Sequence, residues 1–291
     1  MMDELITLLI APPATPAAVL LWALIGLVMG SFLNVVIHRL PLMMQRESDN
    51  YVAAENDQPP VHTERYNLLL PRSACPVCHH PLSAVENIPL LSFLWLRGRC
   101  RHCQTPIPSR YPIVELCTAA LTALVAWRMG TQTLGLASLV MLWFLIAMSC
   151  IDLDTQILPD DLTLPLLWLG LLFNLHGGFV PVQDAVIGAA AGYLSLWLVY
   201  WLFHFATGKE GIGYGDFKLL AALGAWLGWV MLPLIVLLSS AVGALVGLLL
   251  IALRGHARDK PIPFGPFLAM AGLVALLAGD AIIAFYLSKL T

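Results

Sequence analysis

Residues 134–154 read LGLASLVMLWFLIAMSCIDLD, and this stretch decides the fold. Its first 18 residues carry no charge, and a run of this length can cross the hydrocarbon core of a bilayer as an α-helix. Asp152 and Asp154 then place two carboxylates where the predicted helix ends. Because similar apolar runs recur along the chain, the sequence predicts an all-α membrane protein.

The composition of the whole chain indicates the same class. Of its 291 residues, 59% are hydrophobic and only 11% are charged, and the mean hydropathy is +0.82. An ordinary soluble domain has about 25% charged residues, so a soluble globular protein is excluded. The formal net charge of −3 argues against a nucleic-acid partner, because such partners are bound by basic surfaces.

The apolar runs also predict how the chain is divided. We predict about eight transmembrane helices, near residues 16–36, 112–129, 134–151, 162–180, 183–206, 217–230, 232–254 and 265–287. The predicted domains are residues 1–39 with the first helix, residues 40–111 as a small polar insert between helices 1 and 2, and residues 112–291 with the other helices.

The Lys and Arg residues predict the orientation in the membrane. With the N-terminus outside, 13 of the 15 basic residues lie in cytoplasmic segments, and Arg128 and Lys289 are the two exceptions. Short loops rich in Lys and Arg stay in the cytoplasm, so we expect a cytoplasmic insert. One helix more or fewer would move the later basic loops to the other side of the membrane, so this distribution also favours the count of eight.

The insert has two parts. Residues 45–65 are charged and poor in apolar side chains, which is typical of a mobile connection. The second part holds two pairs of cysteines, Cys75-Pro-Val-Cys78 and Cys100-Arg-His-Cys103, with 21 residues between them. Two such pairs deliver four thiolates to a tetrahedral zinc ion, so we predict a zinc-ribbon-like fold. Four Cys ligands leave no open coordination position, so we expect the metal to be structural.

Other roles for the cysteines and nearby histidines stay open at this point. Disulfides are the alternative to zinc, although a cytoplasmic insert is kept reduced. His79, His80 and His102 could replace a cysteine ligand or hydrogen-bond to one. Cys117 and Cys150 fall within apolar runs, and we expect them to be small core residues.

Two groups of carboxylates lie where predicted helices meet the cytoplasm. Asp152 ends the third helix, and Asp216 begins the sixth within Gly213-Tyr-Gly-Asp216. The predicted topology places both acids on the same side of the membrane and at the same depth. Two neighbouring carboxylates can share one proton, so that one activates a water while the other protonates a carbonyl oxygen. Asp152 and Asp216 are therefore our candidate catalytic pair.

These acids also have structural interpretations. Asp160 or Asp161 precedes an apolar helix and fits the N-cap position. Asp216 could cap the sixth helix and pair with Lys209 or Lys218.

Several polar residues near the candidate pair and in the first helix are harder to assign. Asp154 is either a solvated loop residue or a support for the pair. In the first predicted helix, Ser31, Asn34 and His38 follow helical spacing, and we expect them to face the bundle interior and hydrogen-bond there. A contact with the substrate is the alternative for these residues.

With these motifs in view, the chain resembles the type IV prepilin peptidases, a family of GxGD aspartic peptidases that also methylate their products. The resemblance covers nearly the whole chain. It rests on GSFLNVVIHRLP at 30–41, the two CxxC pairs, ENIPL at 86–90, RYPIVEL at 110–116, IDLD at 151–154, LPD at 158–160, GYGDFKLL at 213–220 and PFGP at 263–266.

The resemblance implies a site and a reaction. Asp152 and Asp216 match the family's catalytic aspartates, and the four cysteines match its cytoplasmic cluster. The substrates would be type IV prepilins and type II secretion pseudopilins, whose short basic leader is removed at the cytoplasmic face of the bacterial inner membrane. In this multi-pass topology the N-terminus of the enzyme is periplasmic.

The resemblance also implies that the new N-terminal amine is methylated from S-adenosylmethionine. No motif in the chain resembles the glycine-rich turn of a soluble methyltransferase. We name Gly98, in the tight turn before Cys100, as the candidate for the methyl-donor site. Glu86, Glu115 and Glu210 are candidate partners for the basic leader.

Two other functions fit the composition. A small-solute or metal transporter with a zinc-ribbon gate would also have many helices and intramembrane acids, but no two halves of the sequence look like repeats. A non-enzymatic assembly factor would use the insert to bind a partner, and it would tolerate replacement of Asp152 and Asp216.

Overall fold

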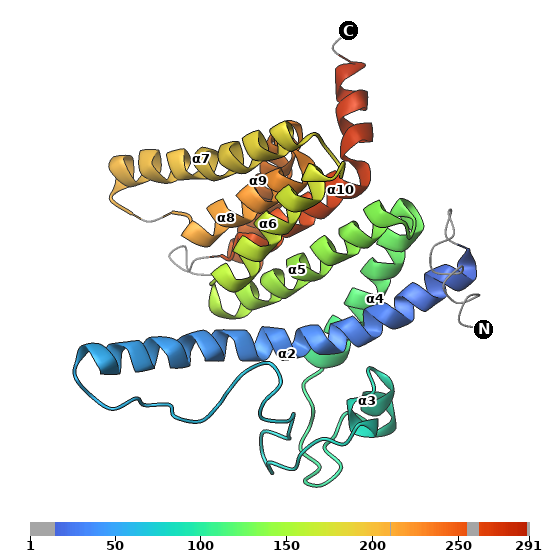
Figure 1. Ribbon diagram of the computed structural model, residues 1–291, viewed down its shortest axis with the longest axis vertical. Helices are drawn as coiled ribbons and strands as arrows, with labels where there is room; N and C mark the ends of the chain where they lie inside the picture. Colours follow the sequence, from blue (N-terminus) through green and yellow to red (C-terminus); the bar gives the residue numbers. More distant parts are fainter. Residues whose placement is uncertain (1–14, 210, 255–261, 290–291) are drawn as a thin grey trace. The chain divides into compact units, whose positions relative to one another are not determined.

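The computed structural model describes residues 15–209, 211–254 and 262–289, and all regular secondary structure in these ranges is helical. No strand is present in these ranges, so the all-α prediction is confirmed. The longer helices are α2 (Pro16–Glu55), α4 (Arg110–Met129), α5 (Thr133–Thr155), α6 (Asp160–Leu175), α7 (Val182–Thr207), α8 (Tyr214–Leu227), α9 (Leu232–Arg254) and α10 (Gly265–Leu287) (Figure 1). Between them lie the short elements η1 (Val85–Asn87), α3 (Leu91–Trp95) and η2 (Trp229–Met231).

These eight longer helices coincide with the eight predicted spans, but two of them are short. Among the described residues, six helices are long and apolar enough to cross a membrane, and the other two are α6 with 16 residues and α8 with 14. At 1.5 Å per residue these two are about 24 and 21 Å long, whereas the hydrocarbon core is about 30 Å thick. The predicted helices are therefore present, and the number of full crossings is approximate.

The chain forms two compact units, residues 1–132 and residues 133–291. In the first unit, α2 and α4 pack closely at a Gly-x-x-x-Gly pattern on α2. A Cβ atom on Gly26 would lie 2.7 Å from the Cα of Ala119, and one on Gly30 would lie 2.7 Å from the Cα of Glu115. Small residues at this spacing let two membrane helices approach backbone to backbone.

α2 is longer than the sequence analysis predicted. It continues without interruption through Pro41 to Glu55 and is about 60 Å long. The prediction of a mobile connection is therefore wrong for residues 45–55. Residues 42–55 contain no glycine or proline and several good helix formers. Because the helix is already nucleated within the apolar run, its extension needs little further stabilisation.

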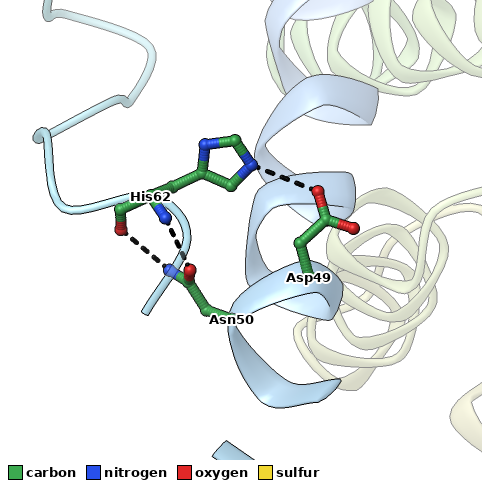
Figure 2. A network of polar contacts seen from close by, with 3 residues as sticks. All are labelled: Asp49, Asn50 and His62. Atoms are coloured by element: carbon green, nitrogen blue, oxygen red, sulfur yellow. Dashed lines mark hydrogen bonds and ion pairs between the residues drawn. The ribbon is translucent and has the colours of Figure 1, made fainter. Parts of the chain in front are cut away.

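The chain that follows α2 is tied back to it. Figure 2 shows that His62 Nε2 lies 3.1 Å from Asp49 Oδ2, and that Asn50 makes two hydrogen bonds with the backbone of His62. Nearer the middle of α2, the buried guanidinium of Arg39 donates to two carbonyls within residues 67–71, at 2.9 and 2.6 Å. Residues 62–71 of the insert are therefore anchored to α2.

In the second unit, α8 lies at the centre, packed against α6, α7 and α10 (Figure 1). Almost every residue from 216 to 227 is buried. Gly188 of α7 faces Gly224, and a methyl group on either would overlap the carbonyl of the other. α8 also packs closely against α6, where the indole of Trp226 covers Gly170. This close packing fixes the position of the first turn of α8, where Asp216 lies.

Candidate active site and metal centre

Asp152 lies in the last turn of α5, and its side chain is buried. Its Oδ2 accepts a hydrogen bond of 2.9 Å from the backbone N–H of Gly265, the first residue of α10. The N-terminus of a helix favours negative charge, so this contact suits a carboxylate. A Cβ atom on Gly265 would lie 2.7 Å from the same oxygen, which explains why glycine is needed in the PFGP motif.

Asp216 lies in the first turn of α8 and is also buried. Its Oδ2 accepts a 3.2 Å hydrogen bond from the N–H of Gly213. Its other oxygen, Oδ1, is buried and has no hydrogen-bond partner among the described residues. Leaving a buried carboxylate oxygen unpaired costs about 1–3 kcal/mol or more, and native proteins keep such groups mainly where they have a function.

Packing around Leu158 brings the two buried aspartates to one site. Leu158, in the turn between α5 and α6, lies between the backbones that hold them. A Cβ atom on Gly215 would lie 2.6 Å from Leu158 Cβ, and one on Gly265 would lie 3.1 Å from Leu158 Cδ1. The IDLD, LPD, GYGD and PFGP motifs therefore converge on one site within the second unit.

The other acids of this region have structural positions. The N-cap of α6 is Pro159, so the prediction that Asp160 or Asp161 occupies this position is wrong, although both lie in the first turn. Asp160 instead accepts two hydrogen bonds of 2.6 and 2.7 Å from Lys218 Nζ, which links α6 to α8. Lys218 is therefore engaged with Asp160, and Asp216 caps its own helix through Gly213. The side chain of Asp154 is exposed.

The glycine at the start of α10 provides a test of this geometry. We expect Gly265→Ala to lower the rate of peptide cleavage by about 10- to 100-fold, since a misplacement of about 1 Å can have an effect of this size. The added methyl would displace either Asp152 or the first turn of α10. The rate of prepilin cleavage by the purified variant measures the effect. Gly279→Ala in the same helix is the matched control, because its methyl would meet the flexible end of Met231; equal rates in the two variants would contradict the assignment.

The four cysteines of the insert gather at one point. Their sulfur atoms all lie within 4.8 Å of one another. The Sγ atoms of Cys75 and Cys103 are 3.7 Å apart, and those of Cys78 and Cys100 are 3.9 Å apart. A tetrahedral zinc ion with Zn–S distances of about 2.3 Å holds its sulfurs about 3.8 Å apart. The four thiolates therefore fit such an ion, and the clustering predicted from the spacing is confirmed.

Each pair of cysteines lies in its own local turn, and the two turns have the same form. We call these turns, around Cys75–Cys78 and Cys100–Cys103, the two knuckles. The N–H of the first cysteine donates to the carbonyl five residues later, from Cys75 to His80 and from Cys100 to Thr105. Both turns have a residue with positive φ directly after the second cysteine, and both read CxxCxxP. This short internal repeat is visible in the sequence, but the sequence analysis did not identify it.

The histidines near the cysteines form a separate group. The imidazoles of His80 and His102 lie against each other with ring centroids 3.5 Å apart and planes tilted by 33°, and Glu86 lies beside them. Glu86 Oε2 accepts hydrogen bonds from the hydroxyl and the amide of Ser83, at 2.6 and 2.8 Å. These bonds hold the pKa of Glu86 below its usual range. One ligand atom from each of His80, Glu86 and His102 lies within 4.8 Å of the others, so these three side chains could also hold a metal ion.

The remaining candidates lie in the first unit, apart from Glu210, which is outside the described residues. Glu115 is buried and accepts a hydrogen bond of 2.7 Å from the N–H of Leu90. Asn34 donates to the carbonyl of Tyr111 at 3.1 Å. Asn34 thus faces α4 as predicted and Ser31 is half-buried, whereas His38 is exposed and the prediction for it is wrong.

Gly98 has a φ of +67°, a conformation that side chains rarely adopt. A Cβ atom here would stand 3.0 Å from the ring of Phe93. The N–H of Gly98 donates to the carbonyl of Phe93 at 2.8 Å, which closes the turn after α3. The backbone at Gly98 therefore has a shape that only glycine fits without strain.

Comparisons with known proteins agree with this arrangement of motifs. Residues 24–129 match the Bacterial Peptidase A24 N-terminal domain, and residues 139–248 match the Type IV leader peptidase family. The Prepilin leader peptidase/N-methyltransferase of Aeromonas salmonicida is 60% identical over 271 residues, which cover 92% of this chain and 93% of the relative. The protein of the same name from Stutzerimonas stutzeri is 54% identical over 276 residues, or 94% and 96% of the two chains. No solved structure matches the chain.

These matches extend over both units and include the segments that carry the aspartates and the cysteines. A relative that is 60% identical over more than nine-tenths of both chains establishes common descent and a common fold. The chain therefore belongs to the type IV leader peptidase family.

Proposed function

We propose that this protein removes the leader from type IV prepilins and type II secretion pseudopilins, and then methylates the new N-terminal residue. The observation that carries the proposal is the buried carboxylate of Asp216, whose Oδ1 has no partner among the described residues and which the packing around Leu158 brings to the same site as Asp152. The names of the relatives, which combine a leader peptidase with an N-methyltransferase, support the same pair of activities.

In the proposed mechanism, Asp152 and Asp216 share one proton. The ionised carboxylate takes a proton from a water molecule, whose oxygen attacks the scissile carbonyl carbon. The protonated carboxyl group donates its proton to the carbonyl oxygen. When the tetrahedral intermediate collapses, the C–N bond breaks, and the leaving amine receives the proton that the first carboxylate took from the water. The second carboxylate takes back the proton of the carbonyl oxygen, so the pair again holds one proton. No acyl-enzyme forms, and the pair titrates as a unit.

The proposed location follows from the substrate. The mature part of a prepilin begins with an apolar helix, which lies in the bilayer, so the junction with its basic leader emerges at the membrane surface. We assign the site to the cytoplasmic face of the bacterial inner membrane, with the N-terminus of the enzyme in the periplasm. The distribution of Lys and Arg along the chain supports this orientation.

In this proposal the insert binds zinc and takes part in methylation. Cys75, Cys78, Cys100 and Cys103 would hold a structural zinc ion, which stabilises the two knuckles when bound. S-adenosylmethionine supplies the methyl group, and Gly98, directly before the second knuckle, is our candidate for its site. The three-part organisation, with a first helix, a cytoplasmic insert and a peptidase domain at residues 112–291, belongs to the same proposal.

The glycine of this turn offers a way to separate the two activities. We expect Gly98→Ala to reduce methylation strongly while cleavage continues, because an alanine here is strained at positive φ and meets Phe93. Transfer of labelled methyl groups from S-adenosylmethionine to a cleaved pilin measures the first activity, and gel mobility measures the second. Gly130, at the C-cap of α4, also has positive φ but open space around it, so Gly130→Ala is the matched control. Undiminished methylation by the Gly98 variant would remove it from the site.

The substrate class can be tested with purified protein in detergent. We expect the protein to shorten a type IV prepilin and to leave unchanged a variant whose last leader residue, glycine, is replaced by a bulky residue. A prepilin that stays intact, with folded and zinc-loaded protein, would contradict the proposal and favour a transporter or an assembly factor.

A further inference from the structure

The insert exposes an apolar surface that nothing covers within the described residues of the first unit. It consists of Ile88, Leu91, Leu94 and Trp95, on and next to α3, and we call it the α3 patch. The side chains of Leu91, Leu94 and Trp95 are 64%, 62% and 75% exposed. Clustered large apolar side chains of this exposure mark a surface that meets a membrane or a partner.

The charges around the α3 patch are mainly basic. Residues 86–109 contain three arginines, Arg97, Arg99 and Arg101, and one acid, Glu86, which accepts a hydrogen bond from Ser83. All three arginines are exposed. Exposed tryptophan and leucine beside basic residues are typical of segments that lie in the interface of an anionic bilayer. The charge therefore favours phospholipid over a basic leader peptide as the group that meets this surface.

The attachment of α3 to α4 sets the depth of the α3 patch relative to the bilayer. The N–H of Leu90, directly before α3, donates to Glu115 Oε2 at 2.7 Å. Glu115 is the sixth residue of α4, about 8 Å along a helix that is long and apolar enough to cross the membrane. The patch thus begins at the second turn of a membrane helix, on the side where the insert leaves the bilayer.

We propose that the α3 patch lies in the headgroup–acyl boundary of the leaflet that faces the insert, where it anchors the zinc knuckles on the lipid surface. One consequence rests on the proposed function: docking would hold Gly98, three residues after Trp95, at the level where a cleaved prepilin presents its amine. The docking itself depends on neither activity, and it can be measured without substrate.

The test uses the full-length protein, labelled with 5-fluorotryptophan, in nanodiscs that contain phosphatidylglycerol. Trp95→Phe removes one ¹⁹F resonance and so assigns it. We expect this resonance to be broadened by a lipid spin-labelled near the headgroup and to be little affected by an aqueous gadolinium chelate. In the variant Leu91→Asn/Leu94→Asn, the two effects should be reversed.

Leu69→Asn is the matched control, because Leu69 is an exposed leucine of the same insert outside the α3 patch. It should leave the Trp95 resonance unchanged, and the zinc content of each variant reports whether the knuckles are intact. Broadening of the wild-type resonance by the aqueous chelate would overturn the proposal. Protection that appears only after a prepilin is added would also overturn it, and would assign the patch to the substrate. Lipid contact together with absent cleavage would keep the docking and contradict the proposed function.

Discussion

Asp216→Asn is expected to abolish leader cleavage, with a loss of at least about 10³-fold, and to leave the protein folded. A general acid or base contributes about 10²- to 10⁴-fold to a reaction, and asparagine can neither take nor give the proton that the pair shares. The variant keeps an oxygen that can accept the hydrogen bond from Gly213, so the start of α8 should persist. Initial rates of prepilin cleavage measure the loss, and Asp152→Asn should match it.

Asp280→Asn is the matched control for this experiment. Asp280 lies in α10 and is exposed, so the same chemical change there should leave the rate within a factor of about two, as surface substitutions cost little. Cleavage by the Asp216 variant at the rate of this control would refute the catalytic assignment.

The Cys103→Ser variant is expected to bind no zinc, and its insert is expected to become disordered. Structural zinc contributes about 10–16 kcal/mol to the folding of small zinc-finger peptides. The two isolated β-bridges of the described chain each lie within one knuckle, so no strand pairing joins the two knuckles. We expect the zinc content to fall from one ion per chain to near zero, methylation to be lost, and the insert to become sensitive to protease. Removal of zinc from the wild-type protein by a strong chelator should have the same effects.

Cys117→Ser is the control for the cysteine variant, because Cys117 lies on α4 and is exposed, away from the cluster. Its zinc content should equal that of the wild type. A Cys103→Ser protein that still holds one zinc ion per chain and resists protease would show that the four-thiolate assignment is wrong.

Much of the fold could be predicted because apolar runs report helices directly. The run at 134–151 became α5 (Thr133–Thr155), and the eight predicted positions all hold helices. The extension of α2 to Glu55 could not be read from composition. Residues 45–55 are polar enough to be disordered alone, and their helix depends on a nucleus that lies upstream. α8 ends at Leu227 because Gly228 takes a positive φ of 78° at its C-cap.

The candidate site was predictable in part for a similar reason. A carboxylate at the end of an apolar run is unusual, so Asp152 and Asp216 stand out from the sequence. The contact between Asp152 and the N–H of Gly265 spans 113 residues and depends on how α10 packs against α5. The role of Lys218 also needed the structure, because its partner Asp160 is 58 residues away in the sequence.

The transporter and assembly-factor hypotheses make different predictions about the same residues. A transporter needs its acids at the depth of the transported solute, whereas Asp152 and Asp216 each lie at the end of a helix. An assembly factor has no use for a buried carboxylate oxygen without a partner. Both features favour a peptidase.

The most direct test of the central claim is the intact mass of a type IV prepilin after incubation with the purified protein and S-adenosylmethionine. The account predicts that the wild-type protein removes the leader and adds the mass of one methyl group to the mature pilin. With the Asp216→Asn protein, the prepilin should keep its full mass. An unchanged prepilin after incubation with folded, zinc-loaded wild-type protein, or equal processing by the variant, would contradict the account.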